Sequence, residues 1–259
     1  MTGHGSTGAA GPAVILLLAL GYDLLSLRAP GWSRWRAAAF LAGCAVLVAG
    51  LAWPVHDLTG HTAHHLLVAM VAPLGLVLGA PVTLLLRTLP VTAARRLTRV
   101  LRSRPIRCGT HPLTALMLTV GGPGTLYLTP LYARTLTEPA LHDLVTLHFV
   151  LSGILFAWVI AGPDPAPHRP SVPARLILLG VAIGAHAALS QLLYAGVFVQ
   201  VPVTAADRQA AATLMYYGGD LAELALAFAL LQSRGRPRST GALRWNTAAA
   251  TSRPGAPAR

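Results

Sequence analysis

Long apolar runs separated by short polar segments dominate the sequence. Seven runs are long enough for membrane-spanning helices, because a helix needs about 20 mostly apolar residues to cross roughly 30 Å of hydrocarbon. No segment has the alternating pattern of a membrane β-strand, and helices satisfy their own backbone hydrogen bonds in lipid. The expected spans are residues 12–28, 37–54, 61–86, 111–133, 139–161, 174–199 and 208–232.

The composition supports this interpretation and excludes a soluble domain. Hydrophobic residues make up 54% of the 259 residues and charged residues only 11%, whereas soluble domains average about 25% charged residues. A disordered chain would have far less apolar content. We therefore predict an all-α, polytopic integral membrane protein, with a short leader at 1–11, a seven-helix bundle at 12–232 and a disordered, arginine-rich tail at 233–259.

The arginines fall on one side of this predicted bundle. The chain has a formal net charge of +12 and contains no lysine. All arginines except Arg134 and Arg208 follow the first, third, fifth or seventh span. Since basic loops stay in the cytoplasm, the N-terminus is predicted outside and the C-terminus inside, which an odd number of spans requires. Contact with the lipid bilayer thus explains the charge, and no nucleic-acid partner is expected.

Proline and glycine interrupt the predicted spans. Pro73 should kink the third span and Pro123 the fourth, and the Gly-Gly-Pro-Gly run at 121–124 should break the fourth helix locally. Gly75 and Gly79 form a GxxxG pattern in the third span, and Gly180 and Gly184 form another in the sixth. Such small residues allow two membrane helices to approach closely.

Ionisable side chains inside the spans are the strongest indication of function, because they are costly in lipid. In the predicted orientation they lie between the outer surface and the bilayer midplane. His61 and His65, at i and i+4, project from one helix face, and Asp57 is placed to orient the His61 ring. Imidazole suits copper, zinc, iron and nickel. The candidate metal ligands are His61, His65, His142, His148, His186 and Asp220.

The same residues also allow plainer interpretations. His148 and His186 could be buried rings bonded to a carbonyl or a carboxylate, and Asp220 and Glu223 could bond to neighbouring helices. His64 could face the outer interface. The methionines of the spans could serve packing alone.

Several stretches, in a consistent order across roughly residues 50–232, resemble the CtaG-type cytochrome c oxidase assembly proteins of bacteria. They are His61-Thr-Ala-His64-His65 with Leu78-Gly79-Ala80-Pro81, then Leu126-Tyr127-Leu-Thr-Pro130-Leu-Tyr132, Leu141-His142 through His148-Phe149 to Gly162-Pro163-Asp164-Pro165, the His186 helix, and Asp207-Arg208-Gln209 leading to Gly219-Asp220.

The sequence departs from many such relatives at two positions. Here His64 stands where they have glutamine, and Leu126-Tyr127 stands where they have Trp-His. The resemblance implies a multi-pass protein of the bacterial cell membrane that assists assembly of a haem–copper cytochrome c oxidase. Oxidase subunits are its implied partners, and a copper ion, bound transiently on the outer side, is its implied cofactor.

Two other classes of function stay open at this point. Opposing histidines could hold a haem for electron transfer, although Cys44 and Cys108 form no CxxCH motif. Buried ionisable groups could instead relay protons or ions in a transporter, although no inverted repeat is evident. An enzyme is not expected, since no nucleophile–base motif, phosphate-binding loop or HExxH sequence occurs.

Overall fold

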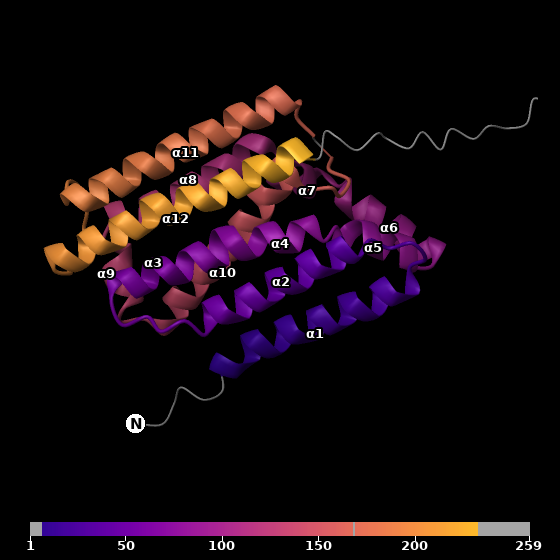
Figure 1. Cartoon of the computed structure of the whole chain (residues 1–259), viewed down its shortest axis with the longest axis horizontal. Helices are drawn as coiled ribbons and strands as arrows, with labels where there is room; N and C mark the ends of the chain where they lie inside the picture. Colours follow the sequence, from indigo (N-terminus) through magenta and orange to yellow (C-terminus); the bar gives the residue numbers. More distant parts are fainter. Residues whose placement is uncertain (1–6, 168, 233–259) are drawn as a thin grey trace, which may run out of the picture.

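The computed structural model describes residues 7–167 and 169–232, and every regular element in these ranges is a helix (Figure 1). The predicted tail at 233–259 and the first six residues lie outside the described ranges. In chain order the elements are α1 (Thr7–Arg28), α2 (Arg34–Leu51), α3 (Leu58–Leu66), the π-helix η1 (Leu67–Val71), α4 (Ala72–Leu78), α5 (Pro81–Thr88), α6 (Val91–Leu101), α7 (Arg104–Gly109), α8 (Pro112–Leu128), α9 (Leu131–Thr135), α10 (Pro139–Ala161), α11 (Val172–Ala195) and α12 (Ala205–Gln232).

Five of the helical segments form a closed ring. The continuous segment α3–η1–α4 packs against α12, α12 against α11, α11 against α8, α8 against α10, and α10 back against α4 and η1. Helices α1 and α2 lie outside this ring, where α2 contacts α4 and α1 contacts α2 and α5 (Figure 1). The ring therefore encloses the space in which side chains from five segments can meet.

In the part of the chain that the structure describes, six helical segments are long and apolar enough to cross a membrane, which makes this a multi-pass membrane protein. They are Gly11–Arg28, Arg34–Leu51, Leu58–Thr88, Pro139–Ala161, Val172–Ala195 and Ala205–Gln232. The predicted fourth span corresponds to α8, which has 17 residues and ends at Leu128, just before Pro130. The all-α prediction is confirmed, whereas the count of seven spans and the orientation of the termini stay predictions.

The third span is interrupted at both of its prolines. Pro73 has no N–H to donate to the carbonyl of Ala69, and immediately before it the helix widens into η1, where the Ala72 amide bonds the carbonyl of Leu67. Ala80 then takes a left-handed conformation, with φ of +54°, before Pro81 starts α5. Next to Pro73, where a kink was predicted, the structure therefore has a π-turn.

The glycine patterns have different outcomes in the structure. Pro123 and the glycines around it lie inside α8, which continues through 121–124, so the predicted break there is wrong. A Cβ atom on Gly180 would meet nothing within 4 Å, so this part of the GxxxG pattern makes no close helix contact. The Gly75–Gly79 pattern does make a close contact, as predicted: Gly75 lies against Gly43 of α2 and Gly79 against Phe40, with no room for a side chain at either glycine.

Two helices, α3 and α5, each begin at a carboxylate that comes from a distant part of the chain. Asp207 accepts hydrogen bonds from the amides of Leu58 and Thr59, at 2.9 and 3.1 Å, and from the Thr59 hydroxyl at 2.7 Å. Asp164, 2% exposed, bonds the start of α5 in the same way through Val82 and Thr83. Each carboxylate supplies the acceptor that the first amides of a helix lack.

Replacing Asp207 with alanine should destabilise the protein. The variant leaves two amides and a hydroxyl at the start of α3 without their acceptor, which should cost about 1–3 kcal/mol. Thermal unfolding of the purified protein in detergent measures the loss. Asp143→Ala is the control, because the Asp143 side chain is 74% exposed. Equal melting temperatures for the two variants would contradict this role of Asp207.

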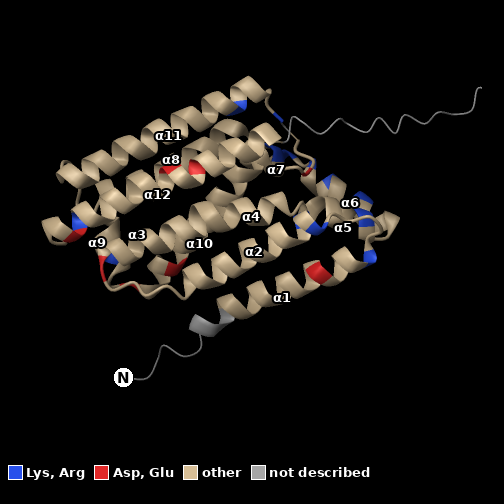
Figure 2. Cartoon of the chain, in the orientation of Figure 1, with Lys and Arg blue, Asp and Glu red and all other residues tan. Residues whose placement is uncertain are grey.

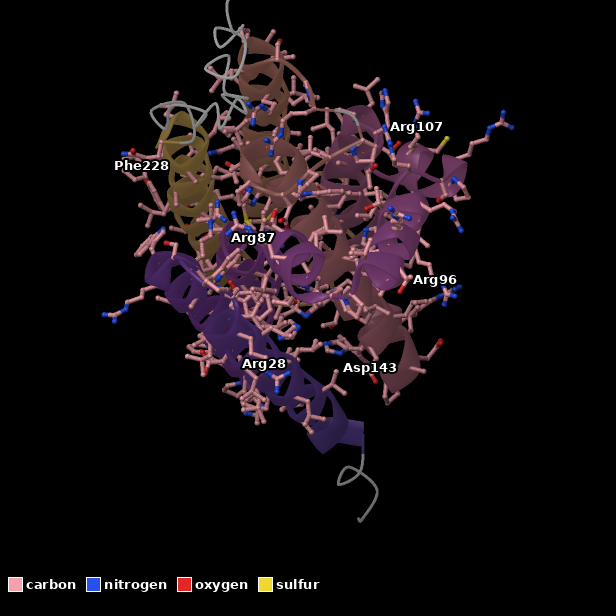
Figure 3. All side chains as sticks on the ribbon, turned by 90° about the vertical axis from the view of Figure 1, so that its right-hand side faces the viewer. Arg28, Arg87, Arg96, Arg107, Asp143 and Phe228 are labelled. Carbon is pink, nitrogen blue, oxygen red and sulfur yellow. The ribbon has the colours of Figure 1, made fainter. Side chains whose placement is uncertain are left out.

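The arginines gather at one end of the molecule, around α5, α6 and α7, as Figure 2 shows. Helix α6 has no buried residue and carries Arg95, Arg96 and Arg99. Arg96 and Arg107 point outward in Figure 3, which faces this end. The start of α3 lies at the opposite end, where basic residues are few and acidic ones lie beside them.

Candidate functional site

Four histidines meet near the arginine-poor end of the bundle. Helix α3 presents His61, His64 and His65, which are 1%, 3% and 8% exposed. The first turn of α10 adds His142, whose ring centroid lies 6.1 Å from that of His61 and 5.9 Å from that of His64. We call these residues the outer histidine cluster, after the side on which the arginine distribution predicts this end to lie. It combines two elements that are far apart in sequence.

The closest pair in this cluster is His61 and His65. Their Nε2 atoms are 2.8 Å apart, and their ring centroids are 4.2 Å apart in an edge-on arrangement. One ring must donate to the other, and the Nδ1 atoms of both rings are buried without a hydrogen-bond partner in the described part of the chain. Since unpaired buried polar atoms are costly, this pair is suited to a ligand that uses the nitrogen lone pairs.

The other two histidines have different surroundings. His64 donates from Nδ1 to the carbonyl of Gly50 at 2.8 Å, and its Nε2 lies 3.4 Å from the Thr146 hydroxyl. These contacts link α2, α3 and α10 and fix the His64 ring inside the bundle, not at the outer interface. His142 is 29% exposed, and its Nδ1 lies 3.8 Å from a carboxylate oxygen of Asp143. His142 is thus the member of the cluster nearest to solvent.

Asp57 does not hold the His61 ring as the sequence suggested. Its carboxylate caps α3, accepting a hydrogen bond from the Gly60 amide at 2.6 Å. Aromatic rings surround His61 instead, with the centroid of Tyr132 at 4.9 Å and that of Tyr127 at 6.4 Å. Both tyrosines belong to the Leu-Tyr-Leu-Thr-Pro-Leu-Tyr stretch. The sequence did not predict that Tyr132 packs against His61.

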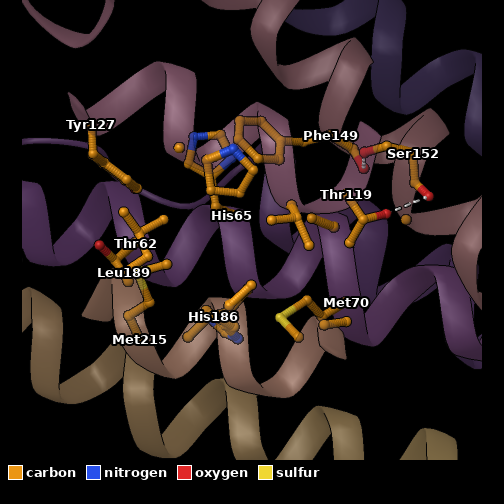
Figure 4. A pocket seen from close by; sticks show the side chains of 18 of the residues that line it. Thr62, His65, Met70, Thr119, Tyr127, Phe149, Ser152, His186, Leu189 and Met215 are labelled. Carbon is orange, nitrogen blue, oxygen red and sulfur yellow. Dashed lines mark hydrogen bonds between the residues drawn. The ribbon is translucent and has the colours of Figure 1, made fainter. Parts of the chain in front are cut away.

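A cavity of about 260 Å³ lies inside the ring of helices, next to the outer histidine cluster. Its walls are mostly apolar, and its titratable lining residues are His65, Tyr127, His186 and Glu223. Two thioethers, those of Met70 and Met215, also line it. Figure 4 shows His65 on one side of this space, and His186, Met70 and Met215 on the other.

His186 lies against a glutamate on the next helix. Its Nδ1 is 3.4 Å from Oε1 of Glu223, whose side chain is 6% exposed. The ring packs directly on Gly219, where any side chain would collide with it. Asp220, the carboxylate proposed from the sequence, is half-buried on a neighbouring face of α12. The structure therefore pairs His186 with Glu223, whose role the sequence left open.

His148 lies apart from both groups. Its ring fills the space beside Gly122 of α8, where a Cβ atom would be 2.6 Å from Nε2 of His148. His148 lies six positions after His142 on α10, so the two rings do not share a helix face. Among the described residues, no three His, Cys, Asp or Glu side chains are placed to hold one metal ion together.

Comparison with known proteins places the chain among bacterial proteins. It is 38% identical over 192 residues to an uncharacterized protein of Mycobacterium bovis and to one of Mycobacterium tuberculosis, and 34% identical over 191 residues to one of Mycobacterium leprae. These alignments cover 68–70% of this chain but 29% of each relative, so the chain matches less than a third of their length. No solved structure matches. Residues 17–235, which hold all the helices of the ring, match the family described as cytochrome c oxidase caa3 assembly factor (Caa3_CtaG), and the chain belongs to that family.

Proposed function

We propose that this protein assists assembly of a haem–copper cytochrome c oxidase in the bacterial cell membrane by holding Cu(I) at His61 and His65, on the outer side. The observation that carries this proposal is the buried pair of Nε2 atoms 2.8 Å apart, with both Nδ1 atoms unpaired in the described part of the chain. The ion is cargo for an oxidase subunit, so the protein itself is not an enzyme.

The donor set favours copper in its reduced state. Imidazole nitrogen binds several transition metals, but Cu(I) accepts fewer ligands than Zn(II), which prefers a closed tetrahedral shell. Two rings from one helix leave positions open on the ion, and the ring centroid of His142 on α10 lies 6.1 Å from that of His61. An ion held this loosely can be passed to a partner. Because His142 is the most solvent-exposed ring of the cluster, it marks the side on which the ion enters or leaves.

The arrangement does not favour a bis-histidine haem. Haem ligands stand on opposite faces of a macrocycle, whereas the His61 and His65 nitrogens bond to each other from successive turns of one helix. His148 and His186, the other candidate ligands, lie against Gly122 and Gly219 without space for a macrocycle between ring and backbone.

The test is complementation of a deletion strain, with cytochrome c oxidase activity measured in isolated membranes. The His61→Ala/His65→Ala variant should lose most of the activity that the wild-type protein restores, and added copper should return it. His56→Ala is the matched control, because His56 is exposed in the same outer segment. Full activity of the double variant would overturn the proposal. Failure of copper to rescue a variant present at normal levels would point to a scaffolding role instead.

A further inference from the structure

We propose that the cavity inside the helix ring contains a second binding site for Cu(I), formed by His186, Met215, Met70 and Glu223. We call this site the second station. This inference rests on the proposed function, because it assumes that the protein carries copper. The outer pair and the second station are separate sites with different donors. Copper would lie on imidazole nitrogen alone at the first and on nitrogen and thioether sulfur at the second.

One face of α12 supplies half of this second station. Met215, Gly219 and Glu223 follow one another at i, i+4 and i+8, so they lie along the same side of the helix, about 5.4 Å apart per turn. The His186 ring packs on Gly219. The thioether and the carboxylate therefore stand one turn to either side of the imidazole, and all three residues line the cavity.

The facing wall supplies the second thioether. Met70 belongs to η1, and it lines both the main cavity and a smaller one that also includes Glu223. The π-turn widens the helix at this residue and shifts the face that Met70 presents, compared with a regular helix. In Figure 4 Met70 and Met215 stand on the two sides of His186.

The chemistry of these donors selects a soft monovalent cation. Thioether sulfur binds Cu(I) and has little affinity for hard divalent ions. A cation in a mostly apolar cavity also needs a nearby negative charge. Glu223 meets that need, since it is 5% exposed and its Oε2 is buried without a hydrogen-bond partner in the described part of the chain.

His65 connects the two stations. Its Nε2 faces His61 in the outer cluster, while the residue also lines the cavity, and its Nδ1 is unpaired in the described part of the chain. An ion held at the outer pair is therefore separated from the cavity by a single imidazole ring. The arrangement gives Cu(I) a route inward from the outer cluster without passing through lipid.

The experiment measures Cu(I) stoichiometry and ligand type in the purified full-length protein. Titration against a Cu(I) chelator under reducing conditions should give two equivalents for the wild type. X-ray absorption of the loaded protein should show sulfur as well as nitrogen around copper. Met70→Leu/Met215→Leu should lose the sulfur signal and weaken the second equivalent by at least the roughly 10–100-fold that loss of a supporting contact costs. Methionine-to-leucine changes keep side-chain volume, so folding should be preserved.

Matched controls separate this inference from the proposed function. Met117→Leu should leave both equivalents unchanged, because Met117 is 67% exposed. Asp220→Asn should do the same, whereas Glu223→Gln should weaken only the sulfur-bound ion. His61→Ala/His65→Ala should lose the nitrogen-only ion and keep the sulfur signal.

Two results would count against the second station. One equivalent bound to nitrogen alone in the wild type would overturn it while leaving the outer site intact. A sulfur signal that survives in Met70→Leu/Met215→Leu would overturn it as well. Absence of any Cu(I) binding would remove the proposed function itself.

Discussion

A membrane-impermeant maleimide added to intact cells should leave this protein unlabelled, and it should react with Cys108 once the membrane is opened. Cys108 is exposed on α7, within the arginine-rich end, and Cys44 is buried at 4% exposure. Because basic segments are retained in the cytoplasm, the end that carries Cys108 is expected to face inward. The effect is all-or-none and reports orientation directly.

A reporter at the other end makes the labelling test symmetrical. Leu136 is 56% exposed between α9 and α10, at the end where the outer histidine cluster lies. The Cys108→Ser/Leu136→Cys variant should be labelled in intact cells. Labelling of wild-type Cys108 from outside would invert the topology, and it would place the histidine cluster on the cytoplasmic side.

Replacing Gly153 with alanine should destabilise the bundle strongly. A Cβ atom at this position of α10 would collide with the carbonyl of Ala69, which is rigid backbone, and would press on Pro73. Forcing volume into a packed interior costs about 1–3 kcal/mol. A chain of this size should then lose about 2–4 °C of melting temperature per kcal/mol, measured by thermal unfolding in detergent.

Gly180→Ala is the control for that substitution. Both glycines lie in long helices, but a Cβ atom on Gly180 would have open space around it. The control should therefore keep the wild-type melting temperature, or raise it slightly because alanine is the better helix former. Two variants that melt alike would show that η1 and α10 are not packed as closely as the structure has them.

Much of the architecture could be predicted because lipid imposes it. The apolar runs locate the spans, since a helix needs about 20 mostly apolar residues to cross the hydrocarbon. The sequence cannot tell which helices are neighbours, because lipid-facing and core-facing positions of these spans are both apolar. Gly180 and Gly43 look alike in sequence for this reason, and only Gly43 makes a close helix contact.

One part of the candidate site could likewise be predicted from the sequence, and another part could not. The pairing of His61 with His65 follows from their spacing on one helix, and the structure places their rings together. The pairing of His186 with Glu223, not Asp220, depends on which face of α12 meets α11. The spacing of Met215, Gly219 and Glu223 shows in the sequence that they share one face of α12. Only the contact of Gly219 with His186 of α11 shows that this face points into the bundle.

The bonds from Asp207 to the start of α3 have a consequence for biosynthesis. Asp207 lies 149 residues after Leu58, so the ribosome makes it long after α3 has entered the membrane. The first amides of that helix gain their acceptor only when the last helix is inserted. The histidines that begin one turn further along are therefore fixed in place at the final stage of translation, and a truncated chain that lacks α12 has no acceptor for the amides of Leu58 and Thr59.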